Sequence, residues 1–346
     1  MTSPVASTYI KLLSPTRAHK LLSCPQRLAF EQNHVGGGQR HARNPSSQLG
    51  VVVHRTLEFA LKDSGLPTEE AWSLACDEAL ANGVNVRAMP EARRSLLRVQ
   101  RRFPMLLELI LQREAVSDDL RHECELTSPD GQISGQIDLL VLGKRPLVVD
   151  YKTGVALESG EPLGRYGRQL AVYAWLVDQA LGVDVPESML FSLRDGIIHV
   201  DTSRRVRDGV VEEIKAARDA YNERVPGPQP AWPSEEGCTF CPFVGECDEA
   251  WDALELGGLA QLGPGVALIG TVVGEVVTAA NGLAALPIEA HSDPHRGSGI
   301  ISDVPGPVVS QLQAGSKFRC WALGIRSVEP LSLAWRAGAS HLVKLP

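Results

Sequence analysis

The sequence lacks three features that would each indicate a particular class of protein. No uninterrupted apolar run reaches the roughly 20 residues that cross a bilayer, which excludes a membrane-spanning helix. The first 25 residues carry Lys11, Arg17, His19 and Lys20 where a signal peptide needs a continuous apolar stretch, so we expect a cytoplasmic protein. The net charge of -7 gives no global positive field for nucleic acid, although a local basic groove is enough for an enzyme that acts on DNA.

Two further absences narrow the chemistry. No G-x-x-x-x-G-K-[ST] loop occurs, so the sequence carries no P-loop ATPase and any helicase would act in trans. The seven cysteines are odd in number and follow no export signal, which argues against a disulfide framework. With 346 residues, 44% hydrophobic and 22% charged, the composition is that of a globular protein with two domains, or with one large domain and an appendage.

The hydrophobic pattern changes along the chain from helical to strand-like. Residues 50–115 have apolar positions at helical spacing, and residues 120–155 read as short strands separated by turns, in outline an antiparallel meander. Helices are predicted over 167–182 and 204–225, with two strands around the Asp195-Gly196 turn between them. This order predicts an α/β core.

The last third of the sequence differs in composition. Four prolines in residues 226–233 predict an extended connector. Beyond residue 262 the sequence is rich in Val, Gly, Ala and Pro with strand-like runs, so we predict a separate small β domain or barrel over 263–346. An OB-like barrel that stacks single strands on Phe318, Trp321 and Trp335 and a protein-docking module both fit this segment.

Two carboxylates and a lysine occur in consecutive predicted strands. Asp138 lies in GQIDLLVL, and Asp150 and Lys152 lie at i and i+2 of LVVDYKTG, where strand periodicity puts them on one face. Charged side chains at the end of an apolar strand are unfavourable unless they pair or bind a metal. The trio could hold a divalent cation such as Mg²⁺ beside an ammonium, or could form a salt bridge at the strand end.

This pattern resembles the PD-(D/E)xK nuclease superfamily, and specifically its RecB-like branch, over roughly residues 14–250. The resemblance implies a restriction-endonuclease-like core, a mixed sheet flanked by helices, and a Mg²⁺- or Mn²⁺-dependent DNA nuclease that hydrolyses phosphodiester bonds. In the branch, Q-x-x-x-Y contacts DNA and orients the site, and RQLAVYAW supplies Gln169 and Tyr173 one helical turn apart. An upstream helix motif of the branch contributes a histidine ligand, which is His54 in LGVVVHRTLEFAL here.

The resemblance therefore implies a set of site residues. The metal ligands would be His54, Asp138, Asp150 and the Tyr151 main-chain carbonyl, while Lys152 helps to activate the water. Glu58, at i+4 from His54, is a weaker candidate ligand. Glu123 and Glu125 face the same way on the strand before Asp138, and Glu125 fits an accessory ligand or a surface charge.

Four cysteines form a second constellation. Cys238, Cys241 and Cys247 are spaced CxxC-x5-C, and Cys24 lies near the other end of the nuclease region. Four thiolates can hold either zinc or an iron–sulfur cluster, and spacing alone does not choose the metal. Resemblance to AddB-type nuclease domains and CRISPR-associated RecB-like exonucleases favours a [4Fe-4S] cluster, which would close residues 1–250 as one domain. The other three thiols are expected to be buried small hydrophobic groups: Cys76, Cys124 and Cys320.

A basic stripe suggests where DNA would lie. Arg94, Arg98, Arg101 and Arg102 share one face of a predicted helix, which suits phosphate contacts or simply a solvated surface. The function predicted from the sequence is a metal-dependent DNA nuclease, an exonuclease with a preference for single strands as one option, in DNA repair, CRISPR adaptation or phage defence. The competing class is a non-catalytic DNA-binding or assembly subunit that keeps the fold and the cluster as a scaffold.

Overall fold

The computed structural model describes residues 6–34, 45–63, 66–154, 156–158, 161–162, 164–239, 241–263 and 265–345. The chain divides into two compact units that do not follow the order of the sequence. We call one the sheet unit, Tyr9–His19 with Val35–Glu223, and the other the barrel unit, Met1–Thr8, Lys20–His34 and Arg224–Pro346. The division into domains at residues 250–263 stays a prediction.

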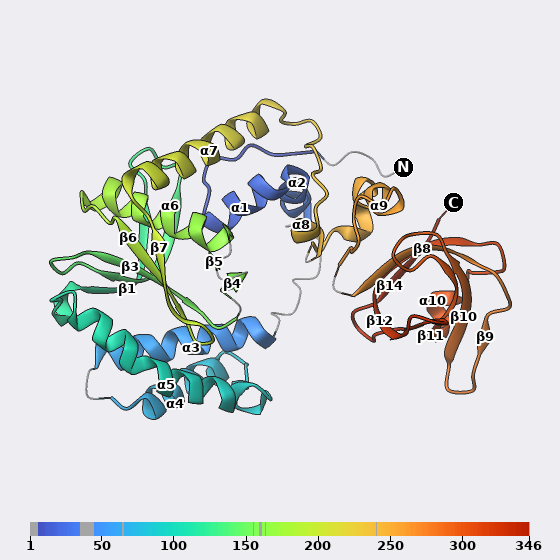
Figure 1. Cartoon of the computed structure of the whole chain (residues 1–346), viewed down its shortest axis with the longest axis horizontal. Coiled ribbons are helices and arrows are strands. Elements are labelled where there is room, and N and C mark those ends of the chain that lie inside the picture. Colours follow the sequence, from blue (N-terminus) through green and yellow to red (C-terminus); the bar gives the residue numbers. More distant parts are fainter. Residues whose placement is uncertain are drawn as a thin grey trace. The chain divides into compact units, whose positions relative to one another are not determined.

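The sheet unit contains a five-stranded mixed sheet with helices on both faces (Figure 1). Its helices are α3 (Pro45–Lys62), α4 (Thr68–Ala81), α5 (Ala92–Leu111), α6 (Gly164–Leu181) and α7 (Arg204–Glu223), with 3₁₀ turns η1 (Val86–Ala88) and η2 (Ser117–Asp119). Its strands are β1 (Leu120–Thr127), β2 (Ser134–Val141), β3 (Leu147–Lys152), β6 (Glu187–Ser192) and β7 (Gly196–Asp201), with a two-stranded ribbon of β4 (Leu157–Glu158) and β5 (Glu161–Pro162). Helix α1 (Pro15–Ser23) contributes to both units. None of the helices in the described residues is both long and apolar enough to cross a membrane.

The sheet has the order β1-β2-β3-β6-β7, and within its described strands β3 and β6 form the one parallel pair. The predicted meander over β1–β3 and the predicted strand pair around the Asp195-Gly196 turn are therefore confirmed. Helices α3, α4 and α5 cover one face, and α6 and α7 cover the other (Figure 1). The predicted α/β class, with a mixed sheet flanked by helices, is confirmed.

Strand β3 is central and buried on both faces, which explains its apolar sequence. Leu147, Val149 and Tyr151 pack in the core beneath α3 and α5. Val148 packs in the core beneath α6, and the alternation of a strand carries Asp150 toward the same helix. The burial of the apolar residues, worth roughly 1.5–3 kcal/mol for each large side chain, fixes the strand that carries the charged groups.

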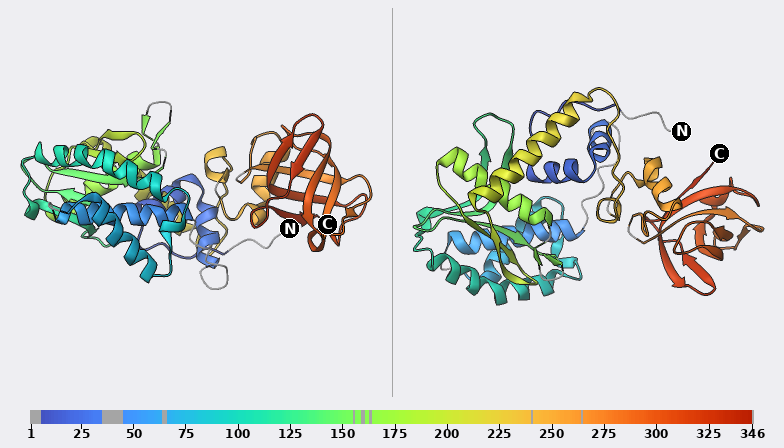
Figure 2. Two further views of the ribbon diagram at one scale, coloured as in Figure 1. Left: turned by 90° about the horizontal axis from the view of Figure 1, so that it is seen from below. Right: turned by 45° about the horizontal axis from the view of Figure 1, so that its top comes forward.

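The barrel unit contains a closed five-stranded barrel, drawn in orange to red in Figures 1 and 2. Its strands are β8 (Val266–Val272), β10 (Leu283–Ala290), β11 (Gly297–Pro305), β12 (Lys317–Ser327) and β13 (Leu331–Ala334). They pair in the cyclic order β8-β10-β11-β13-β12-β8, with β11 and β13 parallel and the other pairs antiparallel. The shorter elements are β9 (Val277–Thr278) on β10, β14 (His341–Lys344) on β12, and α10 (Gly306–Val309) between β11 and β12. The predicted C-terminal β barrel is confirmed.

The remaining elements of the barrel unit precede the barrel in sequence. They are α2 (Pro25–His34), α8 (Glu235–Thr239), η3 (Val244–Glu246) and α9 (Asp248–Glu255). Trp251 of α9 packs against Trp321 of β12 with ring centroids 5.9 Å apart, and Arg319 pairs with Asp248 at 2.7 Å. A shared apolar core with Ala267 of β8 completes this contact. The barrel is thus packed on the cysteine-containing segment of its own unit.

The three aromatics that the sequence offered as stacking platforms in the barrel are engaged in packing. Phe318 is fully buried in the barrel core, against which Trp335 also packs. Trp321 stacks on His341 with centroids 5.0 Å apart. Phe318 is thus closed to stacking on a base, whereas Trp321 and Trp335 are partly exposed and a stacking role for them stays a prediction.

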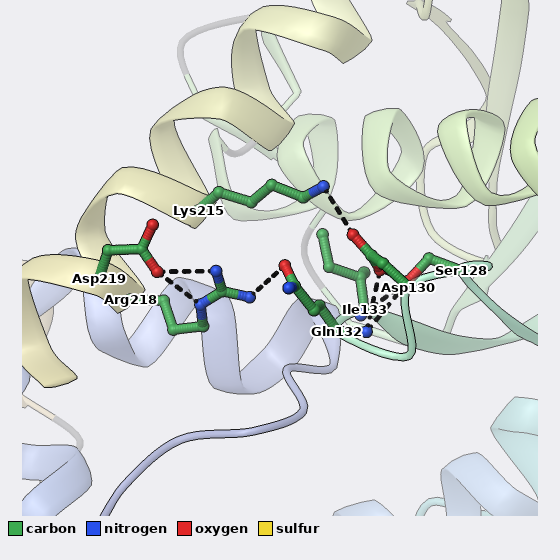
Figure 3. A network of polar contacts seen from close by, with 7 residues as sticks. All are labelled: Ser128, Asp130, Gln132, Ile133, Lys215, Arg218 and Asp219. Atoms are coloured by element: carbon green, nitrogen blue, oxygen red, sulfur yellow. Dashed lines mark hydrogen bonds and ion pairs between the residues drawn. The ribbon is translucent and has the colours of Figure 1, made fainter.

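A polar network connects the β1–β2 turn to α7 (Figure 3). Asp130 accepts hydrogen bonds from the Ser128 hydroxyl at 2.6 Å, from the Gln132 amide nitrogen at 3.0 Å, and from Lys215 of α7 at 3.0 Å. Arg218, also on α7, donates to the Gln132 side chain. These bonds hold the hairpin that carries Asp138.

Gly135 leaves the space that α6 needs to approach β2. A Cβ atom at this position would lie 2.7 Å from Cε1 of Tyr173 and 3.1 Å from Cδ1 of Leu176. Gly167, on α6 itself, has nothing within 4 Å of such an atom. Close packing of α6 on the sheet therefore depends on the first glycine and not on the second.

We predict that Gly135→Ala lowers the free energy of unfolding by about 1–3 kcal/mol, because the added methyl overpacks a rigid ring contact. Gly167→Ala is the matched control and is expected to leave stability unchanged or to raise it by up to about 1 kcal/mol, since alanine favours a helix. Urea unfolding followed by circular dichroism measures both. A Gly135→Ala protein as stable as wild type would contradict the packing described above.

Asp130 gives a prediction for pH. The Ser128 hydroxyl, Lys215 and the Gln132 amide lower the pKa of Asp130 from 3.8 to about 2. The carboxyl is 40% exposed and screened by water, so we expect Asp130→Asn to cost at most about 1 kcal/mol of unfolding free energy at pH 7. Because the folded pKa is below the unfolded value, this contribution is complete above about pH 4 and declines as the pH falls toward 2.

The measurement is urea unfolding of wild type and Asp130→Asn at pH 7, 5, 4 and 3. Glu212→Gln, an exposed substitution on α7, the helix that carries Lys215, is the control. A difference between wild type and Asp130→Asn that stays constant from pH 5 to pH 3 would show that the network does not depend on the charge of Asp130.

Candidate active site and cysteine cavity

Asp150 and Lys152 form the centre of the candidate active site at the end of β3. Asp150 is only 2% exposed, and its Oδ2 atom forms an ion pair with Lys152. Within the described residues the Lys152 ammonium is the partner of this oxygen, and no second donor reaches it. A buried carboxylate oxygen with one cationic partner has lone pairs left for a further cationic ligand.

Helix α6 positions this pair through Gln169 and Tyr173, which lie one helical turn apart. Gln169 donates to Oδ1 of Asp150 at 3.0 Å and to the Tyr173 hydroxyl at 2.9 Å, and its carbonyl oxygen accepts from Lys152 at 3.4 Å. The Tyr166 ring lies 4.7 Å from the lysine nitrogen as a cation–π partner. The structure therefore brings the predicted Gln169 and Tyr173 to the carboxylate–lysine pair.

His54 and Asp138 meet on the other side of β3. Nδ1 of His54 is 3.3 Å from Oδ1 of Asp138, and its Nε2 is 3.1 Å from the Tyr151 carbonyl oxygen. The Tyr151 amide donates to Oδ2 of Asp138 at 2.6 Å. Three of the four metal ligands predicted from the resemblance thus lie in contact: His54, Asp138 and the Tyr151 carbonyl. The fourth, Asp150, precedes Tyr151 on β3.

Glu123 is the acidic residue that the sequence reasoning undervalued. It lies on β1 opposite Asp138, with a positive φ of 47°, and one oxygen of each carboxylate and a ring nitrogen of His54 are all within 4.8 Å of one another. Glu125 is exposed instead, so the structure favours Glu123 over Glu125 as the accessory ligand. The sequence indicates that Glu123 lies across the hairpin from Asp138. The positive φ at residue 123, which changes the direction of the side chain, cannot be predicted from the residue pattern.

Glu58 is buried but already has its own cations. It pairs with Lys62 at 2.6 Å and with Arg55, both on α3. Burial tends to raise the pKa of Glu58, but these two cations more than offset it and lower the pKa. Glu58 is not part of the group formed by His54, Glu123 and Asp138.

The site carries an excess of negative charge. Burial raises the pKa of Asp150 to about 6, with Asp138 adding to the rise and Lys152 only partly offsetting it. Burial and Asp138 likewise raise the pKa of Glu123. Burial alone would lower the pKa of His54, but the carboxylates of Asp138 and Asp150 more than offset it, so this pKa lies above 6.5. A cation bound among these carboxylates would relieve their mutual repulsion.

The donor set fits a hard divalent cation. It offers three carboxylates and a main-chain carbonyl oxygen, which are the oxygen ligands that Mg²⁺ and Mn²⁺ prefer, together with one imidazole nitrogen. The Oδ2 atom of Asp150 and the raised pKa of two acids fit such a cation, because it would pair with this oxygen and offset the repulsion between the acids.

The four cysteines named by the sequence line one cavity in the barrel unit. Cys24 comes from the segment between α1 and α2, Cys238 from α8, and Cys241 and Cys247 from the turns that follow. Phe30 and Phe243, stacked with centroids 5.3 Å apart, also line it. Two segments more than 200 residues apart in the sequence thus present their thiols to a single space.

The sulfurs of these cysteines are not tightly grouped, and burial raises the pKa of several of their thiols. In the described residues, no three of the cysteine sulfurs lie within 4.8 Å of one another. Burial raises the pKa of Cys241 to about 11 and that of Cys247 to about 12. These two thiols hold their protons at neutral pH, and a metal would have to displace the protons to bind. Cys76 and Cys320 are buried elsewhere, as the sequence predicted, whereas Cys124 on β1 is only partly buried.

The predicted arginine stripe is divided among different environments. Arg94 pairs with Glu91 at 2.8 Å, and Arg102 donates to the main-chain oxygen of Arg194 at 3.1 Å. Arg98 lines a cavity beside Thr153, and Arg101 is exposed. The stripe is thus not a uniform surface for phosphates.

Comparison with known proteins assigns the family. No curated protein matches the sequence significantly. A presumed exonuclease from Eubacterium rectale is 9% identical over 70% of this chain and 88% of its own, with a TM-score of 0.43. An alkaline exonuclease from Laribacter hongkongensis is 11% identical over 51% of this chain and 90% of its own, with a TM-score of 0.24. The sequence profile of the PD-(D/E)XK nuclease superfamily matches residues 12–248, more than half of the chain, so the chain belongs to that superfamily.

Proposed function

We propose that the protein is a Mg²⁺- or Mn²⁺-dependent deoxyribonuclease that acts as an exonuclease. The observation that carries the proposal is the convergence of buried Asp150, its partner Lys152 and the His54–Glu123–Asp138 group at one end of the sheet. A purely structural salt bridge would need only one carboxylate, whereas three neighbouring carboxylates repel one another and destabilise the fold unless they bind a cation.

The metal ligands in this proposal are His54, Asp138, Asp150 and the Tyr151 carbonyl, with Glu123 as an additional carboxylate. A bound divalent cation supplies an activated water and offsets the charge that develops on the phosphate. The protein holds the ligands before the cation arrives. The Tyr151 amide donates to Asp138, and the Tyr151 carbonyl oxygen lies against His54, so the backbone of one residue orients two ligands.

Lys152 is the proposed catalytic cation. Its ammonium contacts Asp150, the carbonyl oxygen of Gln169 and the Tyr166 ring. These contacts restrict the Lys152 side chain to one conformation. In that place it orients the attacking water and stabilises the additional negative charge on the phosphate. Gln169 and Tyr173 act as positioning residues, since they fix Asp150 and Lys152.

We further propose that the four-cysteine cavity holds a [4Fe-4S] cluster, as in the RecB-like branch that the sequence resembles. The observation that supports it is that four thiols from two distant segments line one cavity, since four thiolates are the ligand set of such a cluster. Zinc takes the same four thiolates, so the preference for iron rests on the resemblance.

The barrel and the biological setting belong to the proposal as well. A closed five-stranded barrel in which β11 and β13 are the parallel neighbours supports an OB-like domain. Its aromatics are packed, which favours docking to a protein, such as a helicase acting in trans, over stacking on single strands. DNA repair, CRISPR adaptation and phage defence remain the settings that fit.

We predict that Lys152→Ala reduces DNA cleavage about 10²–10³-fold, which is the usual cost of removing one preorganised cation or donor from a transition state. End-labelled single- and double-stranded DNA is incubated with Mg²⁺ or Mn²⁺ and anaerobically purified protein, and the product ladder distinguishes exonuclease from endonuclease action. Lys144→Ala, which removes a 75% exposed lysine from the turn between β2 and β3 in the same unit, is the matched control and should cut like wild type.

Two outcomes would contradict the proposal. Wild-type rates from Lys152→Ala would remove the lysine from the mechanism. DNA binding without cleavage by wild type, with its cysteine site intact, would identify the chain as the non-catalytic DNA-binding or assembly subunit.

For the cysteine site we predict brown protein with about four irons per chain after anaerobic purification. Cys241→Ser is expected to lose the colour and the iron, because one of four thiolates is removed. Cys76→Ser is the control. Cys76 is buried in the sheet unit and does not line the cysteine cavity, so this variant should keep its iron. Colourless protein with one tightly bound zinc would refute the cluster.

A further inference from the structure

A cavity of about 670 Å³ lies beside the end of β3 in the sheet unit. Thr153 and Gly154, which line it, directly follow Lys152 in the chain. Its other walls come from the start of α3, from the turn at η1 and from the first turns of α5. The cavity therefore adjoins the candidate active site without containing any of the residues assigned to it.

Arg98 gives this cavity a positive charge. Its side chain is half-buried, and within the described part of the chain it has no ion pair or hydrogen bond. Glu91 also lines the cavity, but its carboxylate is paired with Arg94 at 2.8 Å. A partly desolvated guanidinium without an acidic partner is costly in isolation and is well suited to a phosphate.

The rest of the cavity is divided between hydrogen-bonding and apolar groups. Ser95, which is 6% exposed, and Thr153 offer hydroxyls, and Asn85 offers an amide that does not cap its own turn. Leu49 and Met89 form an apolar wall. Nucleotides combine an anionic phosphate with a flat, largely apolar base, and the volume lies within the range of small-ligand sites.

We propose that this cavity binds one nucleotide of the DNA strand next to the bond that is cut, with its phosphate on Arg98 and its base against Leu49 and Met89. The inference rests on the proposed nuclease function. The backbone runs without a break from Lys152 to Thr153, so a strand whose scissile phosphate lies at the lysine presents a neighbouring nucleotide to the cavity. A base that enters the cavity has left its stack, so the bound strand is single or frayed at this nucleotide.

The test is a chemical double-mutant cycle. Wild type, Arg98→Ala and Arg101→Ala are titrated with fluorescent single-stranded oligonucleotides in EDTA, where cleavage cannot occur, and fluorescence anisotropy gives the affinities. Each oligonucleotide carries one neutral methylphosphonate at a different position. Arg101→Ala removes the same charge from an exposed position on the same helix and is the matched control.

We expect Arg98→Ala to bind unmodified DNA about tenfold more weakly and to lower the salt slope by about 1, with a smaller effect from Arg101→Ala. One methylphosphonate position should weaken wild type and Arg101→Ala about tenfold but leave Arg98→Ala unaffected. Arg98→Lys should restore part of the affinity, because the charge returns without the planar fork.

The outcomes separate the inference from the proposed function. If every methylphosphonate weakens Arg98→Ala as much as wild type, or if Arg101→Ala loses as much affinity as Arg98→Ala, the nucleotide site is overturned while nuclease activity stands. If wild type neither binds DNA in EDTA nor cuts it with Mg²⁺ or Mn²⁺, the proposed function fails and this inference fails with it.

Discussion

The burial of Asp150 between β3 and α6 is the constraint on which the rest of the site depends. A carboxylate that is 2% exposed loses its hydration and must recover the free energy from the protein. Lys152 and Gln169 provide part of this, but Asp138 repels it, and the pKa of Asp150 rises to about 6. Keeping this charge buried at neutral pH therefore costs stability, as is common at functional sites.

In the barrel unit, segments that are distant in the sequence are packed together. Cys24 and the Cys238–Cys247 segment meet at one cavity, and α9, which follows that segment, packs through Trp251 against Trp321 of the barrel. The apolar core beneath them includes both Cys238 and Ala267, so the cysteine segment and the barrel share buried surface. A cluster bound at the cysteines would close a loop of more than 200 residues and would at the same time fix the surface on which the barrel packs.

Much of the candidate site could be predicted from the sequence because its chemistry follows local spacing. Strand periodicity put Asp150 and Lys152 on one face, and helical periodicity put Gln169 and Tyr173 one turn apart, as the hydrogen bonds now show. Glu123 was missed because its left-handed backbone, with φ at 47°, breaks the alternation on which the comparison with Glu125 relied. Strand β10 was likewise not predicted, since Pro287 within it is atypical of a paired strand.

The four arginines of α5 show where sequence periodicity stops being informative. Their spacing predicted one stripe that either contacts phosphates or is simply solvated, and all four do lie on the single helix α5. What distinguishes them is the presence of a partner, which comes from other segments: Glu91 for Arg94 and a main-chain oxygen beyond β6 for Arg102. Arg98 lies in a cavity formed with the η1 turn and the end of β3, and it has no such partner among the described residues. The capacity of an arginine to bind substrate depends on what the fold leaves for it to bind, and a residue pattern along one helix cannot record that.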